Sequence, residues 1–384
     1  MKLLHTADLH IGKRVNEFSM LEDQAYILGQ MLQIAREEKV DAVIIAGDVY
    51  DKTVPPQEAV QLFDWFLTEL NQREIPVCVV TGNHDSTERV SFASRILEGR
   101  GVYVTPVYDG MVKPIEFKDA YGSVRIWMLP FLKPAYVRRA FPNEEVTTYQ
   151  EAVKLAVEKL PMNPLGRNVL AAHQFVTGAV PAGSEDFLGA EGMDLQVGGI
   201  DQVDGSIFSS FDYTALGHIH RAGAAGSPVI RYSGTPLKYS FSEIRHKKSV
   251  TIVELLEKGT VHCRQIPLVP KRDMRAIYGS YEELTRKSNY EGSNLDDYIR
   301  ITLTDENDIP DAIGKLRSIY PNIMKLDYDN QRTRSSQMVD ELPEEKRKTP
   351  LELLEDFYVL QNNQPMGKEQ EAFAGELIRK IWET

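Results

Sequence analysis

Cysteine is scarce in this sequence, and long apolar runs are absent. Its 384 residues include only two cysteines, Cys78 and Cys263, which excludes the disulfide framework of small secreted domains and fits a reducing cytoplasm. No apolar run approaches the roughly 20 residues that a membrane-spanning helix needs. The first residues, a lysine and two leucines followed by polar side chains, lack the pattern of a signal peptide. We therefore expect a cytoplasmic protein without a membrane segment.

An excess of basic residues is also missing. The net charge of -12 argues against a protein that holds nucleic acid through a diffuse basic field. It does not exclude an enzyme that cuts nucleic acid, because carboxylates that bind a metal count as negative and a partner subunit could supply basic surface. Hydrophobic residues make up 42% of the chain and charged residues 26%, an ordinary balance for a globular protein.

The first 270 residues alternate between strand-like and helix-like segments. Short apolar runs at 2–7, 42–46 and 76–81 predict buried strands, and apolar stripes at 25–39 and 57–72 predict amphipathic helices. Further strands are predicted at 124–128, 168–172, 213–216, 229–232 and 249–255. Such alternation favours an α/β fold with a mostly internal sheet.

The length of the chain indicates a large domain with smaller additions. We expect a large domain at 1–270 and a small α+β domain at 271–330, with the order strand, helix, strand, helix, strand. Residues 331–348 are polar and charged and are interpreted as a linker. Two amphipathic helices are predicted within 349–384, separated by a proline and a glycine.

Side chains that can bind a metal follow five of the predicted strands at the point where each strand ends. They are Asp8 and His10, Asp48, Asn83 and His84, His173, and His218 and His220. In open α/β sheets, ligands bind outside the carboxyl ends of the strands, so these groups should converge on one site. In an extended segment residues i and i+2 point the same way, so we expect Asp8 with His10, and His218 with His220, to act as two-pronged clamps.

Asp48 is placed centrally and has two oxygens, which makes it the natural bridge between two cations. Asn83 offers a neutral oxygen that limits the charge in the site. The glycines that precede the second, third and fifth groups, Gly47, Gly82 and Gly217, should let the backbone turn and leave room near a metal.

Nitrogen and carboxylate donors without cysteine exclude a zinc finger or an iron–sulfur site and suit manganese, iron or zinc. Two such ions about 3.5–4 Å apart can clamp the attacking and leaving oxygens of a displacement at phosphorus.

Each motif alone is more often an ordinary turn or a structural residue than a ligand. The set is more specific, because five of the eight histidines fall in these motifs. The other three, His5, His246 and His262, are interpreted as structural.

The order DxH, GD, GNHD, H, GHxH resembles the calcineurin-like metallophosphoesterase superfamily. Further runs are similar to the nuclease subunits of bacterial DNA-repair complexes in that superfamily: Asp8–Lys13, Gly47–Asp51, Gly82–Ser86, Tyr232–Pro236 and Phe241–Glu243. The resemblance covers most of the chain and is strong through about residue 270. It implies a four-layer α/β sandwich, two packed mixed sheets flanked by helices, with a small α+β capping domain and a helical tail.

The resemblance also implies roles for the site residues. One ion would be held by Asp8, His10, Asp48 and His220, and the other by Asp48, Asn83, His173 and His218. His84 would orient the scissile phosphate or protonate the leaving oxygen. The implied cofactor is two Mn²⁺ ions, with Mg²⁺, Fe²⁺ or Zn²⁺ as substitutes.

The implied activity is exonuclease and endonuclease cleavage of DNA ends and hairpins. The implied partners are a coiled-coil ATPase and a second copy of the chain, in a heterotetramer. The chain has no G-x-x-x-x-G-K-[ST] sequence, so ATP hydrolysis by a P-loop would need another chain. Two alternatives remain: a phosphodiesterase or phosphatase acting on a small molecule or phosphoprotein, and a non-enzymatic scaffold that keeps the metal site as a relic.

Weaker signals surround these motifs. Lys13 and Arg14 could contact phosphates or be solvated, and Asp51, where archaeal and eukaryotic relatives have histidine, could bind substrate or simply end a turn. The long segment 177–204 could touch DNA or a partner, or be a surface excursion. The tail carries apolar stripes that could pack on the main domain or dock on a partner, and the polar linker before them favours docking, for example on an ATPase coiled coil. The stripes comprise Leu351, Leu354, Phe357, Tyr358, Phe373, Leu377, Ile381 and Trp382.

Overall fold

The computed structural model describes residues 1–177, 202–330 and 366–382, together with residues 333, 351, 354, 355 and 358. The chain divides into two compact units. The first comprises Met1–Tyr278, Glu282–Thr302 and Asp311–Asp327, and the second comprises Gly279–Tyr281, Leu303–Pro310 and Tyr328–Thr384. Apart from residue 333, the predicted linker lies outside the described residues, as does most of the predicted loop at 177–204.

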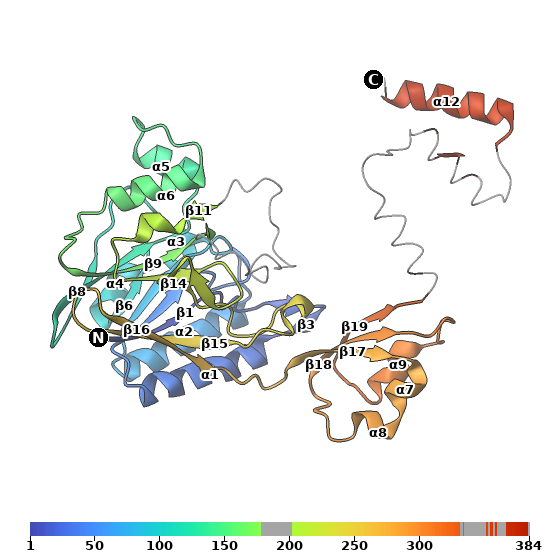
Figure 1. The fold of residues 1–384 in the computed structure, drawn as a ribbon, viewed down its shortest axis with the longest axis horizontal. Helices are drawn as coiled ribbons and strands as arrows, with labels where there is room; N and C mark the ends of the chain where they lie inside the picture. Colours follow the sequence, from blue (N-terminus) through green and yellow to red (C-terminus); the bar gives the residue numbers. More distant parts are fainter. Residues whose placement is uncertain are drawn as a thin grey trace. The chain divides into compact units, whose positions relative to one another are not determined.

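Two six-stranded mixed sheets form the large domain (Figure 1). The first has the order β16-β15-β1-β4-β5-β6, with bounds β16 (Val261–Pro267), β15 (Ser249–Leu255), β1 (Lys2–Thr6), β4 (Ala42–Ala46), β5 (Val77–Val80) and β6 (Val102–Val104). The second has the order β13-β14-β12-β9-β8-β7, with bounds β13 (Gly223–Ala225), β14 (Ser227–Tyr232), β12 (Tyr213–Gly217), β9 (Arg167–His173), β8 (Gly122–Leu129) and β7 (Ile115–Asp119). Strands β1, β4, β5 and β6 are parallel, as are β8, β9, β12 and β14.

The alternation of side chains along β4 explains the layers on one side of the molecule. Val43 and Ile45 pack in a core with helices α1 (Leu21–Glu37) and α2 (Gln57–Gln72), whereas Ile44 belongs to the core between the two sheets. A strand buried on both faces must be apolar throughout, which is why β4 is a continuous apolar run.

The second sheet repeats this arrangement through β9. Val169 and Ala171 face the core between the sheets, and Leu170 packs in a core with helices α5 (Pro134–Ala140) and α6 (Tyr149–Glu158). Figure 1 shows α1 and α2 in blue on one side of the sheets and α5 and α6 in green on the other. The predicted four-layer sandwich is confirmed.

A buried histidine links the two sheets below the motif loops. The His5 Nδ1 lies 2.9 Å from the Tyr213 hydroxyl, and its Nε2 lies 3.2 Å from the Leu216 carbonyl oxygen. Burial lowers the pKa of His5 to about 3, so the ring is neutral. The Nε2–H then donates to Leu216, and Nδ1 accepts from Tyr213. His5 is thus structural, as expected from the sequence, and it ties β1 to β12.

The C-terminal part contains a three-stranded sheet. Its elements, in chain order, are β17 (Met274–Gly279), α7 (Tyr281–Thr285), α8 (Lys287–Tyr290), β18 (Tyr298–Leu303), α9 (Ala312–Arg317) and β19 (Ile323–Tyr328). This matches the predicted order, with one helical segment divided in two. The last predicted tail helix is α12 (Lys368–Trp382). The shorter elements are β2 (Arg14–Val15), β3 (Phe18–Ser19), α3 (Thr87–Val90), α4 (Ser94–Leu97), β10 (Val176–Thr177) and β11 (Val203–Asp204).

Within the described residues, no helix combines the length and the apolar character needed to cross a membrane.

Candidate metal centre

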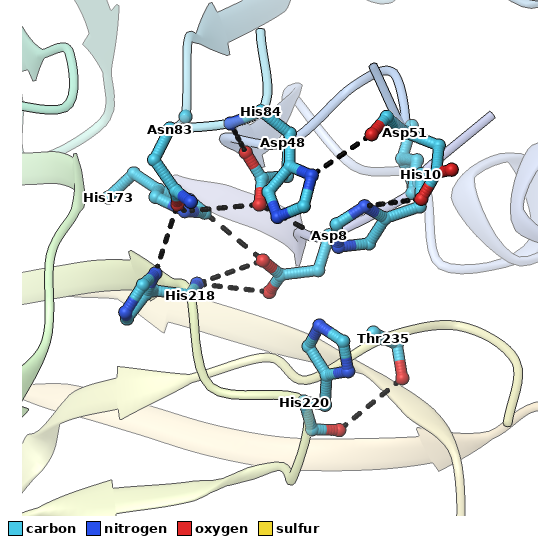
Figure 2. A network of polar contacts seen from close by, with 12 residues as sticks. Asp8, His10, Asp48, Asp51, Asn83, His84, His173, His218, His220 and Thr235 are labelled. Atoms are coloured by element: carbon cyan, nitrogen blue, oxygen red, sulfur yellow. Dashed lines mark hydrogen bonds and ion pairs between the residues drawn. The ribbon is translucent and has the colours of Figure 1, made fainter. Parts of the chain in front are cut away.

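The five motif groups converge at one edge of the large domain. The loops after β1, β4 and β5 of the first sheet meet the ends of β9 and β12 of the second, because these strands are parallel within each sheet. Figure 2 shows the motif side chains pointing toward one another from both sheets. The structure therefore brings together every metal-ligand candidate that the sequence predicts.

Asp48 lies between histidines from both sheets. Its Oδ2 is 3.4 Å from the Nε2 of His173 and 3.6 Å from the Nε2 of His10. Its Oδ1 accepts a hydrogen bond of 2.9 Å from the backbone N–H of His84. One carboxylate thus faces two separate clusters of donors, as a bridging ligand must.

Asn83 and two histidines form one of these clusters. The Asn83 Oδ1 lies 3.0 Å from the Nε2 of His173 and 3.1 Å from the Nδ1 of His218. The Nδ1–H of His173 donates to the backbone carbonyl of Ala46 at 2.9 Å, which leaves Nε2 directed at Asn83 and Asp48. The three side chains come from two sheets and converge on a common point.

Asp8, His10 and His220 form the other cluster. Each offers a ligand atom, and these atoms lie within 4.8 Å of one another. Two further groups meet the same criterion, Asp8 with Asp48 and His173, and His10 with Asp48 and His84. The Asp8 carboxylate also accepts the backbone N–H of His218 at 2.9 Å. These two further groups share Asp48, and each overlaps the first group through His10 or Asp8, which fits two ions held by one bridging carboxylate.

The state of His10 supports a metal at this position. Within the described residues, both ring nitrogens of His10 are buried and have no hydrogen-bond partner. Buried polar atoms are almost always paired, so two orphaned nitrogens in one ring indicate a missing ligand. Burial also lowers the pKa of His10 well below its usual value, so the ring is neutral and can donate a lone pair. The residues present fit a divalent cation.

The buried carboxylates and histidines of the centre have shifted pKa values, and a cation would displace the protons that they carry. Burial raises the pKa of Asp8 to about 6. Burial alone would raise the pKa of Asp48, but the charge of the neighbouring His173 lowers it. Burial lowers the pKa of His218 to about 3. Protons and metal ions compete for the same buried atoms, so metal binding should release protons.

The backbone at the ligands differs from the expected extended form. Asp8, His10 and Asp48 have positive φ angles of 52°, 44° and 49°, and His218 has a φ of 101°. The expectation of extended pairs separated by one residue is therefore wrong. Tertiary contacts impose the left-handed turns: the N–H of Asp8 donates to the Gly47 carbonyl and the N–H of His10 donates to the Asp48 carbonyl, both at 2.9 Å. Such conformations persist only where the surroundings enforce them, which is typical of functional sites.

The three glycines lie where no side chain fits. A Cβ on Gly82 would lie 2.1 Å from the Asp48 Oδ1, and one on Gly217 would lie 1.9 Å from the Ala46 carbonyl oxygen. Gly47 combines a φ of +94° with a Cβ position 2.1 Å from the His173 Nδ1. The expectation that these glycines leave room near the site is confirmed.

Asp85 is a supporting residue that the sequence motifs did not reveal. Its carboxylate is buried and accepts the backbone N–H groups of Val49 at 3.1 Å, Tyr50 at 3.0 Å and Gly82 at 2.9 Å. It therefore joins the loop of Asp48 to the loop of Asn83. Its place at the end of the GNHD run was the available signal.

Gln24 and Tyr239 hold the first loop in the same manner, and they were also missed. The Gln24 Nε2 donates to the His10 carbonyl at 2.8 Å, and its Oε1 accepts the N–H of Gly12 at 3.0 Å. The Tyr239 hydroxyl donates to the Leu9 carbonyl. Gln24 lies among the buried residues of an amphipathic helix, and the sequence offers no signal that singles it out.

His84 and Asp51 lie at the exposed rim of the centre. The His84 Nδ1 is 3.0 Å from the backbone carbonyl oxygen of Asp51, so its Nε2 is the nitrogen left for another partner. The Asp51 Oδ1 accepts from the Lys13 Nζ at 2.7 Å and lies 3.6 Å from the His10 Nδ1. The exposed Arg14 donates to the Glu17 carbonyl. Of the three weak substrate candidates, Asp51 and Lys13 thus lie beside the centre.

Comparison with known proteins places the chain in a family. The model of the calcineurin-like phosphoesterases matches residues 1–222, and that of the type 5 capsule protein repressor C-terminal domain matches residues 270–362. The SbcD subunit of the SbcCD nuclease of Staphylococcus epidermidis is 31% identical over 376 residues, 96% of each chain. Its counterpart from Staphylococcus saprophyticus is 33% identical over 331 residues, 85% of this chain and 84% of the relative.

Among solved structures, a dimetal phosphatase from Danio rerio matches 70% of this chain and 96% of its own, with 13% identity and a TM-score of 0.41. Membership of the family rests on the sequence relatives, which the chain matches along nearly its whole length, and on the phosphoesterase model, which covers more than half of it. The chain belongs to the calcineurin-like metallophosphoesterases and is a nuclease subunit of the SbcD type.

Proposed function

We propose that the chain cleaves phosphodiester bonds of DNA ends and hairpins with two Mn²⁺ ions, in partnership with an SbcC-type ATPase. The observation that carries this proposal is the convergence of nitrogen and oxygen donors from both sheets around Asp48. The relatives are named as subunits of the SbcCD nuclease, which supports DNA as the substrate.

The residues divide between the two ions through Asp48. Asp8, His10, Asp48 and His220 would hold one ion, and Asp48, Asn83, His173 and His218 would hold the other. Bound ions of this kind activate water for attack on phosphorus and neutralise charge on the phosphate oxygens. The donor set suits manganese and also admits Mg²⁺, Fe²⁺ or Zn²⁺.

His84 would act on the substrate. Its Nδ1–H donates to the Asp51 backbone carbonyl. Because the acceptor is a main-chain atom, this bond holds the ring whichever side chain stands at position 51. In the imidazolium form, the Nε2–H of this exposed residue can donate to the scissile phosphate or pass its proton to the leaving 3′ oxygen, which leaves the ring neutral. A DNA phosphate at the rim would also compete with Asp51 for Lys13, so we assign Lys13, Arg14 and Asp51 to substrate contact.

Exposed apolar side chains support the proposed contacts with partner chains. Phe373 and Leu377 of α12 are exposed, as expected of a helix that docks on an ATPase coiled coil. Phe92 and Ile96, which follow the GNHD motif, are 81% and 77% exposed. We assign these two residues to contact with a second copy of the chain, in a heterotetramer of the cytoplasm.

A single comparison of substrates tests the proposal. Labelled duplex DNA, single-stranded DNA and bis-p-nitrophenyl phosphate are incubated with the full chain and Mn²⁺, with and without the ATPase. We expect cleavage of DNA, strengthened on duplex ends by the ATPase and ATP. Turnover of the small phosphodiester far above that of every DNA would instead support the small-molecule enzyme. Failure to bind any metal would support the relic scaffold.

A further inference from the structure

Glu243 lies buried behind His220. It ends a short 3₁₀ segment, Phe241–Glu243, and is only 5% exposed. Its Oε1 lies 3.1 Å from the Nδ1 of His220. Because Nδ1 is occupied by this contact, Nε2 is the nitrogen of His220 that remains for the cluster with Asp8 and His10.

The second oxygen of Glu243 is fully used by other partners. The Oε2 accepts from the Lys248 Nζ and from the Thr235 hydroxyl, the latter at 3.3 Å. Lys248 also donates to the Thr235 Oγ1 at 2.6 Å. Both donors use the same oxygen, so Oε1 is left to face His220 alone. The carboxylate cannot rotate without breaking one of these bonds.

The same residues also hold the backbone of His220. The His220 carbonyl oxygen accepts from the Lys248 Nζ at 3.0 Å and from the backbone N–H of Thr235 at 3.2 Å. Figure 2 shows the Thr235 hydroxyl directed at the same carbonyl, 3.4 Å away, as an alternative acceptor to Glu243 for its one proton. Ring and backbone of one histidine are thus fixed by one unit, Thr235, Glu243 and Lys248.

A buried ion pair alone is weak evidence of a stabilising role, because desolvation offsets most of the attraction between the charges. The two oxygens of Glu243 have different partners, which indicates a role in orienting His220 and not only in stabilising the fold. An ionised Glu243 with Oε1 toward Nδ1 requires the proton of a neutral His220 to sit on Nδ1, and the lone pair then lies on Nε2. Carboxylates behind metal-binding histidines select the tautomer and orient the ring in this way.

We propose that Glu243 is a positioning residue that fixes His220 for the ion shared with Asp8 and His10. This inference rests on the proposed metal centre. His173 provides the contrast, because its Nδ1 is held by the backbone carbonyl of Ala46 and no side-chain substitution can remove that acceptor. The Glu243 contact can be removed by substitution, which makes the role testable.

The test is Mn²⁺ binding to the full chain, measured by calorimetry on wild type, Glu243→Gln and His220→Ala. Lys248 demands an acceptor, so a glutamine should turn its oxygen to Lys248 and its amide N–H groups to His220, which favours the wrong tautomer. We expect one of the two ions to bind about 10–100-fold more weakly in Glu243→Gln. Turnover should recover near the wild-type value at saturating Mn²⁺, as a higher Mn²⁺ requirement with little change in kcat.

The matched control is Glu116→Gln on β7, which removes an exposed carboxylate paired with Arg125 of β8. It should leave both affinities unchanged. Thr235→Val is the second variant, and it loosens Glu243 without removing its charge. It should weaken the same ion by a smaller factor, and it tests the inference even if Glu243→Gln folds poorly.

The outcomes separate the inference from the metal centre. If His220→Ala weakens one ion while Glu243→Gln and Thr235→Val bind both as wild type does, the inference is wrong and the centre stands. A lower melting temperature in EDTA with unchanged Mn²⁺ affinities would likewise show a purely structural role. If wild type binds no ion, or His220→Ala binds both unchanged, the proposed ligand set itself fails.

Discussion

The two sheets contribute different chemistry to the metal centre. The loops of the first sheet supply both carboxylates, Asp8 and Asp48. The end of β9 and the segment after β12 in the second sheet supply imidazoles, those of His173, His218 and His220. The carboxylate loops are joined by main-chain bonds, among them the bond from the N–H of Asp8 to the Gly47 carbonyl.

The difference teaches how a crowded charged site can be held in shape. Two buried carboxylates repel each other, so their loops need bonds that do not depend on a cation. Asp85 supplies two such bonds to the loop of Asp48 and one to the neighbouring loop of Asn83. An imidazole that binds a metal ion is neutral and does not repel its neighbours in this way. For them one contact at the far ring nitrogen is enough to set orientation, as Ala46 does for His173.

The strongest way to break this comparison is Asp48→Ala, because Asp48 faces the donors of both sheets. We expect loss of both ions and a fall in DNA cleavage of more than about 100-fold. Loss of a residue that only hydrogen-bonds to a metal ligand lowers activity by up to about 100-fold, and loss of the bridge should exceed that. Metal analysis of the purified variant and a cleavage assay check this together. Retention of both ions would show that Asp48 is not the bridge.

His84→Gln separates use of the metal from binding of the metal. Loss of one orienting or acidic group should lower turnover about 10²–10⁴-fold, or roughly 3–5 kcal/mol of transition-state stabilisation. Both ions and the DNA affinity should persist, because other phosphate contacts supply most of the binding. His84 also lies within ligand distance of His10 and Asp48. Loss of an ion in this variant would therefore make His84 a ligand and overturn the role given to it.

Asp85→Asn tests the bonds that hold the carboxylate loops. An amide has one acceptor oxygen where the carboxylate has two, so at least one of the three N–H groups loses its partner. We expect a loss of about 1–3 kcal/mol in the free energy of unfolding, together with weaker Mn²⁺ binding. Urea unfolding in EDTA measures the first effect. Asp64→Asn on the exposed face of α2 is the control. An equal effect in that variant would show that Asp85 does not support the loops in the way described.

Asp119→Asn gives the smallest expected effect and tests an ion pair outside the centre. Hydrogen bonds from Arg167, one of them 3.0 Å long, lower the pKa of Asp119 below its usual value of 3.8. The stabilisation is therefore present above about pH 4 and is lost as the pH falls further. We expect the variant to be about 1–2 kcal/mol less stable at pH 7, with the difference shrinking in acid and cleavage unchanged. A constant difference across the pH range would contradict the ion pair.

Much of this fold could be predicted because its signals are local. The apolar run 42–46 had to be buried on both faces, and the stripe at 57–72 matches α2 residue for residue. The edge strands β7 and β16 were not predicted, since they are partly exposed and their patterns are mixed. The ligand candidates could be found because each follows a strand that the sequence reveals.

The remainder of the site depends on contacts that only the folded chain creates. Gln24 donates a hydrogen bond to Tyr239, 215 positions away in the sequence, and no local pattern predicts such a contact. The left-handed conformation of Asp8 is set by the carbonyl of Gly47, a residue on another strand end. Glu243 stood in a run that resembles the family, yet its function follows only from its place behind His220.

The close approach of Gly217 to the Ala46 carbonyl has a consequence for control of the enzyme. The two sheets touch there backbone to backbone, and the His173 bond to the same carbonyl clasps them. Separation of the two sheets at the centre would break this contact and the His173 bond, so we do not expect the centre to be switched off in that way. If the proposed ATPase partner regulates cleavage, we therefore expect it to act on which DNA strand reaches the centre.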